Sequence, residues 1–471
     1  MEFGEIVFYG VLLGVMLAFV AGIVVAFGVG VSAPKVAFYP LLAVLLFFTD
    51  THWGLKEAGT ANVYSRGVGQ LHFSLVNIYL WGLALVLAVT YMFRDVPRQT
   101  CNLYKYLLAF NVFFAGHILA AVLLDVPVLD ALSYRGVLNV LNMSVMVYIM
   151  LHLFDNERDL RRLIDVFVVC ALARGMFGII RFALFGGDPA NVYATVERLD
   201  VTLTFFDVND SLIAVIAAFY SAWRLSFDSK SMRLGEKVFY AIVLLVEVFI
   251  VVFSYRRTNL GGLVLASAFF VLLQPGVRRV WYATGAVLIT VPAVIVILLD
   301  RLEKVGSRSG GLENLFHDLF SNRGEGSVGR LAELEMAFGT IKDHWLLGAG
   351  TWARYDGRGL DFHGGVYDFV HSGVVHVWLK TGLVGLLILT GIAVAYVVFV
   401  HSKRGHIRPD MRGFYEAGFA GVLFMVPNYV MGTPVIEFRT MLLTGFALAI
   451  PYCVHFSHVH SNWMRDARAY T

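Results

Sequence analysis

The sequence predicts an all-α polytopic membrane protein, and three observations support this prediction. The chain has 471 residues, of which 58% are hydrophobic and only 15% are charged. Its mean hydropathy of +0.71 is far above that of a soluble domain. Apolar runs of about 20 residues, long enough to cross a bilayer, recur along most of the chain. A soluble enzyme is therefore excluded, and the net charge of +3 gives no reason to expect nucleic acid as a partner.

Thirteen apolar segments are candidate membrane spans. Segment 35–50 is short for a span, so we expect twelve or thirteen transmembrane helices. The N-terminal run lacks the basic start and cleavage site of a secretory signal, and we expect it to be a retained span. The candidates are 5–31, 35–50, 71–93, 106–124, 135–154, 163–186, 210–227, 238–254, 259–274, 281–299, 379–400, 414–432 and 438–456.

The positions of lysine and arginine predict which end of each helix is cytoplasmic. Alternate connections are rich in these cations, whereas those near 125–134, 187–209 and 433–437 carry few. Cytoplasmic loops are enriched in Lys and Arg, so the basic set should be cytoplasmic and the C-terminus inside. The basic connections contain Arg94, Arg98 and Lys105; Arg158, Arg161 and Arg162; Lys230, Arg233 and Lys237; Arg278 and Arg279; and Lys403, Arg404, Arg408 and Arg412.

Three regions follow from this topology. Residues 1–299 should hold the first ten transmembrane helices, and 371–471 the C-terminal helices with a short cytoplasmic tail. Residues 300–370 are the one large segment outside the membrane, on the external face, and we expect them to form a lid over the bundle. Within the lid, apolar residues at three- and four-residue spacing predict a helix from Arg330 to Leu347, ended by the glycines of GAG at 348–350.

The stretch HSGVVHVWLKTGLVG, 371–385, lies where the lid gives way to a hydrophobic helix. His371 should therefore lie near a membrane surface, where a histidine can accept a proton near neutral pH. Gly382 and Gly385, three residues apart, would let a neighbouring helix approach closely. The alternative is structural, with Ser372 as a helix cap and the two glycines as packing residues.

Several arginines are candidates for binding an anion. Arg256 and Arg257 lie between two hydrophobic helices at the face that normally avoids cations, and Arg330 opens the lid helix. Arginine suits phosphate because its planar fork donates two parallel hydrogen bonds. The alternatives are an interfacial or paired role for the first two, and a helix-surface pair of Arg330 with Glu333 or Glu335.

Two more arginines, Arg174 and Arg181, lie inside the predicted span 163–186. An intramembrane arginine is a functional candidate by default. Arg181 is near the external end and could hold a lipid-linked phosphate, whereas for Arg174 a carboxylate on a neighbouring span is the alternative partner.

The residues of the 371–385 stretch resemble a motif of the O-antigen ligase and O-antigen polymerase superfamily. The family pattern is a histidine, then Asn, Ser or Gln, then nine residues and GxxG, and His371, Ser372, Gly382 and Gly385 match it without a gap. In the family this motif also follows a large loop.

Four further stretches resemble the family, in the same order along the chain. They are TFFDVNDSLIA at 204–214, where Asn209 would bind a sugar or cap the next helix; SYRRTNLGG, with Arg257 in the arginine position and Arg256 before it; the pair Gly329-Arg330; and DHWLLGAG at 343–350, with Gly348 and Gly350 in place and Trp345 instead of proline.

The resemblance implies a GT-C-like membrane glycosyltransferase. It would move a glycan from polyprenyl (undecaprenyl) pyrophosphate to a sugar hydroxyl on the external, periplasmic face of a bacterial inner membrane. His371, Arg330 and Arg257 would be catalytic, and Arg256, Arg181, Asn209 and Ser372 would bind substrate. Direct displacement would invert the anomeric centre.

No metal or other cofactor is expected. The external loop 51–70 lacks an acidic pair for a divalent cation, the chain has no P-loop, and its three cysteines are far apart. Arginines would therefore have to neutralise the pyrophosphate.

Three functions remain open on sequence alone. YSRGVGQLHFSLVNIYLWG, 64–82, looks like the start of polymerases from exopolysaccharide clusters and favours a polymerase, which extends a lipid-linked glycan. A ligase would instead attach the glycan to lipid A-core, and a flippase would bind the same donor without chemistry. Partners would be the lipid-linked donor, a glycan or lipid-linked acceptor and membrane lipids, with a chain-length regulator or flippase as a further candidate.

Overall fold

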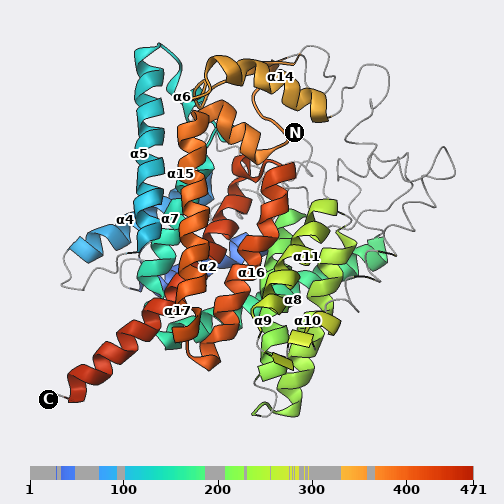
Figure 1. Ribbon diagram of the computed structural model, residues 1–471. Coiled ribbons are helices and arrows are strands. Elements are labelled where there is room, and N and C mark those ends of the chain that lie inside the picture. The colour runs from blue at the N-terminus through green and yellow to red at the C-terminus, as the bar shows by residue number, and fades with distance from the viewer. Residues whose placement is uncertain are drawn as a thin grey trace, which may run out of the picture.

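A computed structural model describes residues 33–47, 74–92, 101–185, 207–227, 231–254, 256–274, 330–357 and 366–469, with Gly28 and some residues between 276 and 295. Helices make up nearly all of its regular structure (Figure 1). They are α2 (Pro34–Phe47), α4 (Leu75–Met92), α5 (Asn102–Leu123), α6 (Val128–Ala131), α7 (Leu138–Leu153), α8 (Glu157–Phe185), α9 (Val208–Phe227), α10 (Leu234–Phe253), α11 (Arg257–Leu272), α14 (Arg330–Asp343), α15 (Gly373–Lys403), α16 (Pro409–Met431) and α17 (Phe438–Ala469). Strands β1 (Tyr355–Asp356) and β2 (Val366–Tyr367) form a short antiparallel pair.

The predicted apolar segments from 35–50 to 259–274, and from 379–400 to 438–456, each coincide with one helix. Among the residues that the structure describes, five stretches are long and apolar enough to cross a membrane: Leu75–Met92, Asn102–Leu123, Glu157–Ile180, Gly373–His406 and Phe438–Val459. The all-α polytopic membrane fold is therefore confirmed. The number of spans stays a prediction, because segment 5–31 and most of 281–299 lie outside the described residues.

One end of the bundle, which we call the basic end, collects the cation-rich connections. Arg408 donates to Glu157 at 2.6 Å and to Asp410 at 2.8 Å, and Arg161 pairs with the same two carboxylates. These contacts join the start of α8 to the start of α16, as the alternation of basic loops predicts. The last residues of α17 also point to this end (Figure 1).

The other end, which we call the lid end, carries α14 (Figure 1). Connections that are far apart in the sequence meet here. Thr351 donates to the carbonyl of Ala131 at 2.9 Å, and Thr433 donates to the carbonyl of Val370. The loop before α7, the segment after α14 and the turn between α16 and α17 therefore share one end, as predicted.

Helix α14 confirms the predicted lid helix at its start and corrects its end. It begins at Arg330 but ends at Asp343, and residues 344–347 form a turn instead of continuing to Leu347. The glycines after the turn are needed for its shape, since Gly348 and Gly350 have φ of +82° and +99°, which L side chains rarely adopt.

Helix α15 is broken at Gly382, where φ is +65°. The break frees two backbone N–H groups, which donate to the turn after α14: Leu383 N–H to Trp345 O at 2.8 Å and Val384 N–H to Leu346 O at 3.1 Å. In return, the N–H of Ala349 donates to Leu379 O at 2.9 Å. The two glycine motifs of the sequence thus dock on each other through main-chain hydrogen bonds.

We therefore expect Gly382→Ala to be strongly destabilising. An added Cβ would overlap the backbone of Leu346 and Gly348, and alanine disfavours the positive φ. Thermal unfolding of the purified protein in detergent measures the effect. Gly116→Ala on α5 is the matched control, because nothing lies within 4 Å of a Cβ there and alanine favours a helix. Equal unfolding temperatures for the two variants would contradict the prediction.

Candidate active site

The lid helix α14 contacts the segment before α15 through Glu333 and His371, which lie at ion-pair distance. Glu333, in the first turn of α14, lies with its carboxylate oxygens 3.0 and 2.9 Å from Nδ1 of His371. The same carboxylate accepts from the backbone N–H of His371 at 3.1 Å. The Glu333 side chain is 8% exposed and that of His371 is 35% exposed. The histidine is thus held at two points by a buried carboxylate while its ring stays accessible.

Tyr355 completes the support of this carboxylate. Its hydroxyl lies 3.2 Å from Oε1 of Glu333 and 3.2 Å from the carbonyl of Phe369, and its ring stacks on Tyr367 across the short strand pair. Burial, followed by the charge of Glu333, raises the pKa of Tyr355, so the hydroxyl stays protonated and can donate.

Sequence reasoning missed Glu333 and Tyr355 as parts of this site. The sequence indicates Glu333 only as a partner of Arg330, because the two residues are three apart on one predicted helix. Spacing along the chain carries no information on a contact with His371, which is formed only when the lid folds back. An acid in the first turn of the lid helix was the available signal.

Ser372 takes the structural role that the sequence left open. It is the N-cap of α15, with its hydroxyl accepting from the N–H of Val375 at 3.5 Å, and it is 7% exposed. Gly385 also packs as predicted, against Phe113 of α5. Gly382 differs, since its close neighbour is the segment after α14 and not another helix.

Two of the predicted arginines, Arg256 and Arg257, lie at the start of α11. Arg256 is the N-cap residue of α11, and Arg257 begins the helix with an exposed side chain. Asn259 donates to Ser211 at 2.8 Å, which places the start of α11 beside the start of α9. Further along, α11 packs on the last turns of α16, whose end at Gly432 accepts from the N–H of Gly373. Both arginines therefore lie at the lid end, as predicted.

For two further candidates, Arg330 and Arg181, the structure gives only the position in a helix. Arg330 is the first residue of α14, one turn before Glu333, and Arg181 lies in the last turns of α8. Their side chains lie outside the described part of the chain.

Asn209 and Arg174 belong to a buried polar cluster between helices. Arg174 makes two hydrogen bonds to Asp210, at 3.1 and 3.0 Å, which confirms the alternative of a carboxylate partner on a neighbouring helix. Arg439 also reaches Asp210, at 3.3 Å. The side-chain oxygen of Asn209 accepts from Thr440 at 2.7 Å, and Asn209 is 2% exposed.

The expected cap at Asn209 is wrong by two positions. Asp207 precedes α9, and its Oδ1 accepts from the N–H of Asp210 at 2.8 Å, which is the geometry of an N-cap. Asn209 instead joins α9 to α17. Sugar binding by Asn209 stays a prediction.

Two buried basic residues lie in the first part of α15. Lys380, 1% exposed, donates to the carbonyl of Ala353 at 2.6 Å. His376, with no exposed surface, has Nε2 at 3.3 Å from the carbonyl of Gly136. Both side chains hold loops of the lid end onto α15.

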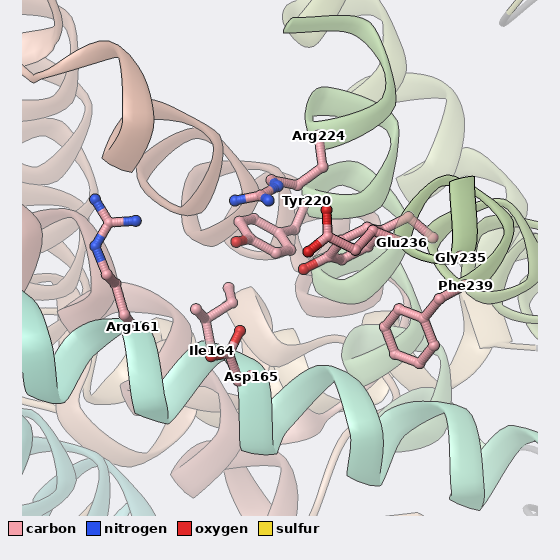
Figure 2. Close-up of a pocket in the computed structure, with 9 residues that line it drawn as sticks. Arg161, Ile164, Asp165, Tyr220, Arg224, Gly235, Glu236 and Phe239 are labelled. Carbon is pink, nitrogen blue, oxygen red and sulfur yellow. The ribbon is translucent and has the colours of Figure 1, made fainter. Parts of the chain in front are cut away.

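A cavity of about 430 Å³ lies at the basic end, far along the bundle from His371. Figure 2 shows Arg161 and Asp165 on α8 facing Tyr220 and Arg224. The Arg224 guanidinium lies 5.3 Å above the ring of Tyr240. This cavity contains none of the predicted site residues. In the part of the chain that the structure describes, no group of three or more His, Cys, Asp or Glu is arranged to hold a metal.

Comparison with known families gives a match over part of the chain. Residues 239–390 match the family described as O-antigen ligase. The match begins in α10 and ends in α15, so it includes both Glu333 and His371. A search of the curated proteins found no match. About a third of the chain is therefore similar to the O-antigen ligase family, which supports a membrane enzyme that transfers glycans.

Proposed function

We propose that this enzyme transfers a glycan from polyprenyl pyrophosphate to a sugar hydroxyl at the external face of the bacterial inner membrane. The observation that carries the proposal is the pair formed by Glu333 and His371 at the start of the family motif. A histidine held by a buried carboxylate is a recurrent arrangement for general-base catalysis.

The proposed reaction is a direct displacement. Glu333 accepts the hydrogen on Nδ1 of His371, which fixes the tautomer whose Nε2 can take up a proton. The acceptor hydroxyl gives its proton to Nε2 while its oxygen attacks the anomeric carbon. The bond between that carbon and the pyrophosphate oxygen breaks, and the lipid pyrophosphate leaves with the electron pair. Glu333 then stabilises the imidazolium.

Arginines at the lid end would stabilise the leaving group. Arg257 and Arg330 are proposed to bind the pyrophosphate, with Arg256 and Arg181 as further candidates. The start of a helix adds partial positive charge, and both Arg257 and Arg330 begin helices. No metal is part of the proposed reaction.

We favour a polymerase, in which the acceptor is a second lipid-linked glycan, over a ligase that uses lipid A-core. The transporter alternative is less well supported. Transporter sites typically use helices broken near the bilayer midplane. Here the candidate arginines Arg256 and Arg257 and the start of α14 instead lie together at one end of the bundle, the lid end.

The test is reconstitution of the purified protein in liposomes with a polyprenyl-pyrophosphate oligosaccharide. Elongation of the glycan with donor alone supports the polymerase. Transfer that requires added lipid A-core would establish the ligase. Movement of the donor across the bilayer without a new glycosidic bond would overturn the proposal of an enzyme.

We expect Arg257→Lys and Arg330→Lys each to lower transfer clearly while the protein folds normally. Lysine keeps the charge but loses the two-point hydrogen bonding that arginine offers a phosphate. Initial rates at varied donor concentration measure the loss. Arg408→Lys at the basic end is the matched control, since its side chain is 45% exposed and binds only carboxylates of the protein among the described contacts. Wild-type rates in both site variants would leave these arginines as structural cations.

A further inference from the structure

The turn between α14 and Gly348 exposes three consecutive large apolar side chains. Trp345, Leu346 and Leu347 are 52%, 46% and 57% exposed. Single exposed apolar residues are common, but a contiguous patch in a polar loop indicates an interaction surface. The turn lies outside every candidate span, so hydropathy alone does not reveal it.

The depth of this turn follows from its contacts. Its carbonyls accept hydrogen bonds from the N–H groups of Leu383 and Val384 in α15. These two residues directly precede Gly385. Gly385 packs on Phe113 of α5, and α5 continues to Leu123, a further rise of about 15 Å. The turn therefore lies beside a candidate membrane span, α5, before the end of that helix. Figure 1 shows α14 and the end of α5 both at the top of the view.

The surface on both sides of the turn is apolar and outward-facing. Near its end α5 exposes Leu119 (61%) and Leu123 (75%), and after the break α15 exposes Leu387 (59%) and Val394 (56%). These helices are two of the candidate membrane spans. The three side chains of the turn thus lie beside exposed apolar surface of two candidate membrane spans.

The backbone of the turn also suits a membrane environment. Irregular backbone at membrane depth is tolerated only where its polar groups find partners inside the protein. Trp345 O accepts from both Leu383 N–H and the indole N–H of Trp378, and Leu346 O accepts from Val384 N–H. The turn can therefore enter an apolar layer with these carbonyls satisfied.

We propose that Trp345, Leu346 and Leu347 insert into the lipid leaflet on the lid side and anchor α14 to the membrane. These side chains would contact lipid at the boundary between head groups and acyl chains, where tryptophan is enriched. Because Glu333 lies on the anchored helix, the anchor sets the height of the lid above the acyl chains. This inference does not depend on the proposed reaction.

The test places a fluorophore at the turn of the full-length protein in liposomes. In a background that lacks Cys101, Cys170 and Cys453, Leu346→Cys is labelled with bimane. Liposomes carry either ordinary or acyl-chain-brominated phosphatidylcholine, and iodide serves as the aqueous quencher. Lys342→Cys, exposed in the last turn of α14, is the matched control, and Leu347→Cys repeats the measurement at a neighbouring position.

The expected result is loss of fluorescence in brominated lipid, with little effect of iodide, for labels at 346 and 347. The label at 342 should respond to iodide and little to bromine. Quenching of 346 and 347 by iodide alone would overturn the proposal, because the turn would then lie in water. Protection from both quenchers would also overturn it, since a protein surface would then cover the patch.

Discussion

A His371→Ala variant is expected to lose glycan transfer by about 10²–10⁴-fold, the usual contribution of a general base. The protein should still insert and fold, because the imidazole is 35% exposed and leaves no large internal void. Binding of the lipid-linked donor should survive, since the proposed binding groups are arginines. Transfer in vitro with purified donor and acceptor, together with donor binding, measures both effects.

Glu333→Gln tests the pairing itself. The amide keeps the size of the side chain but cannot stabilise an imidazolium by charge, so kcat should fall with little change in KM. His406→Ala, an exposed histidine at the basic end, is the control for removal of a histidine. Near-normal activity of His371→Gln, unchanged with pH across the neutral range, would contradict a general base and leave only an orienting hydrogen bond.

The second large effect is on stability. Asp210→Asn should lower the free energy of unfolding by about 3–5 kcal/mol, as expected when one member of a buried ion pair is removed. Asp210 is 2% exposed and binds Arg174 and Arg439, which are 2% and 0% exposed. The variant leaves two buried guanidinium groups without this charge, although Arg439 still lies 3.5 Å from Asp207. Unfolding in detergent, followed by urea or heat, measures the loss.

Asp410→Asn provides the matched control. Asp410 also binds two arginines, Arg161 and Arg408, but their side chains are 41% and 45% exposed. Exposed pairs contribute about 0–1 kcal/mol, so this variant should remain close to wild type. If Asp210→Asn were no less stable than Asp410→Asn, the buried cluster would not hold α8, α9 and α17 together.

The sequence predicts the helices well because each must present a long apolar surface to lipid. It also predicts which connections share an end, since basic residues alternate from loop to loop. Even the partner type of Arg174 could be anticipated, because a buried cation needs a carboxylate or a ligand. These features depend on composition within one segment at a time.

The features that escaped prediction depend on contacts between segments. The glycine at 382 suggested a close neighbouring helix, whereas the helix breaks there and accepts the turn after α14. The cap of α9 is Asp207 and not Asn209. Spacing pairs Glu333 with the nearest arginine, although its partner His371 lies in the segment just before another helix, α15. No periodicity within a single segment could distinguish these alternatives.

The break at Gly382 has a consequence for the order in which the protein is made. Synthesis proceeds from the N-terminus, so α14 and the turn after it leave the ribosome before the backbone groups of Leu383 and Val384 exist. The turn can dock only when α15 has been translated past its break and inserted. Val370 is in turn held by Thr433, which follows α16. The contacts that hold Glu333 against His371 are thus complete only after α15, α16 and the turn at Thr433 have been made.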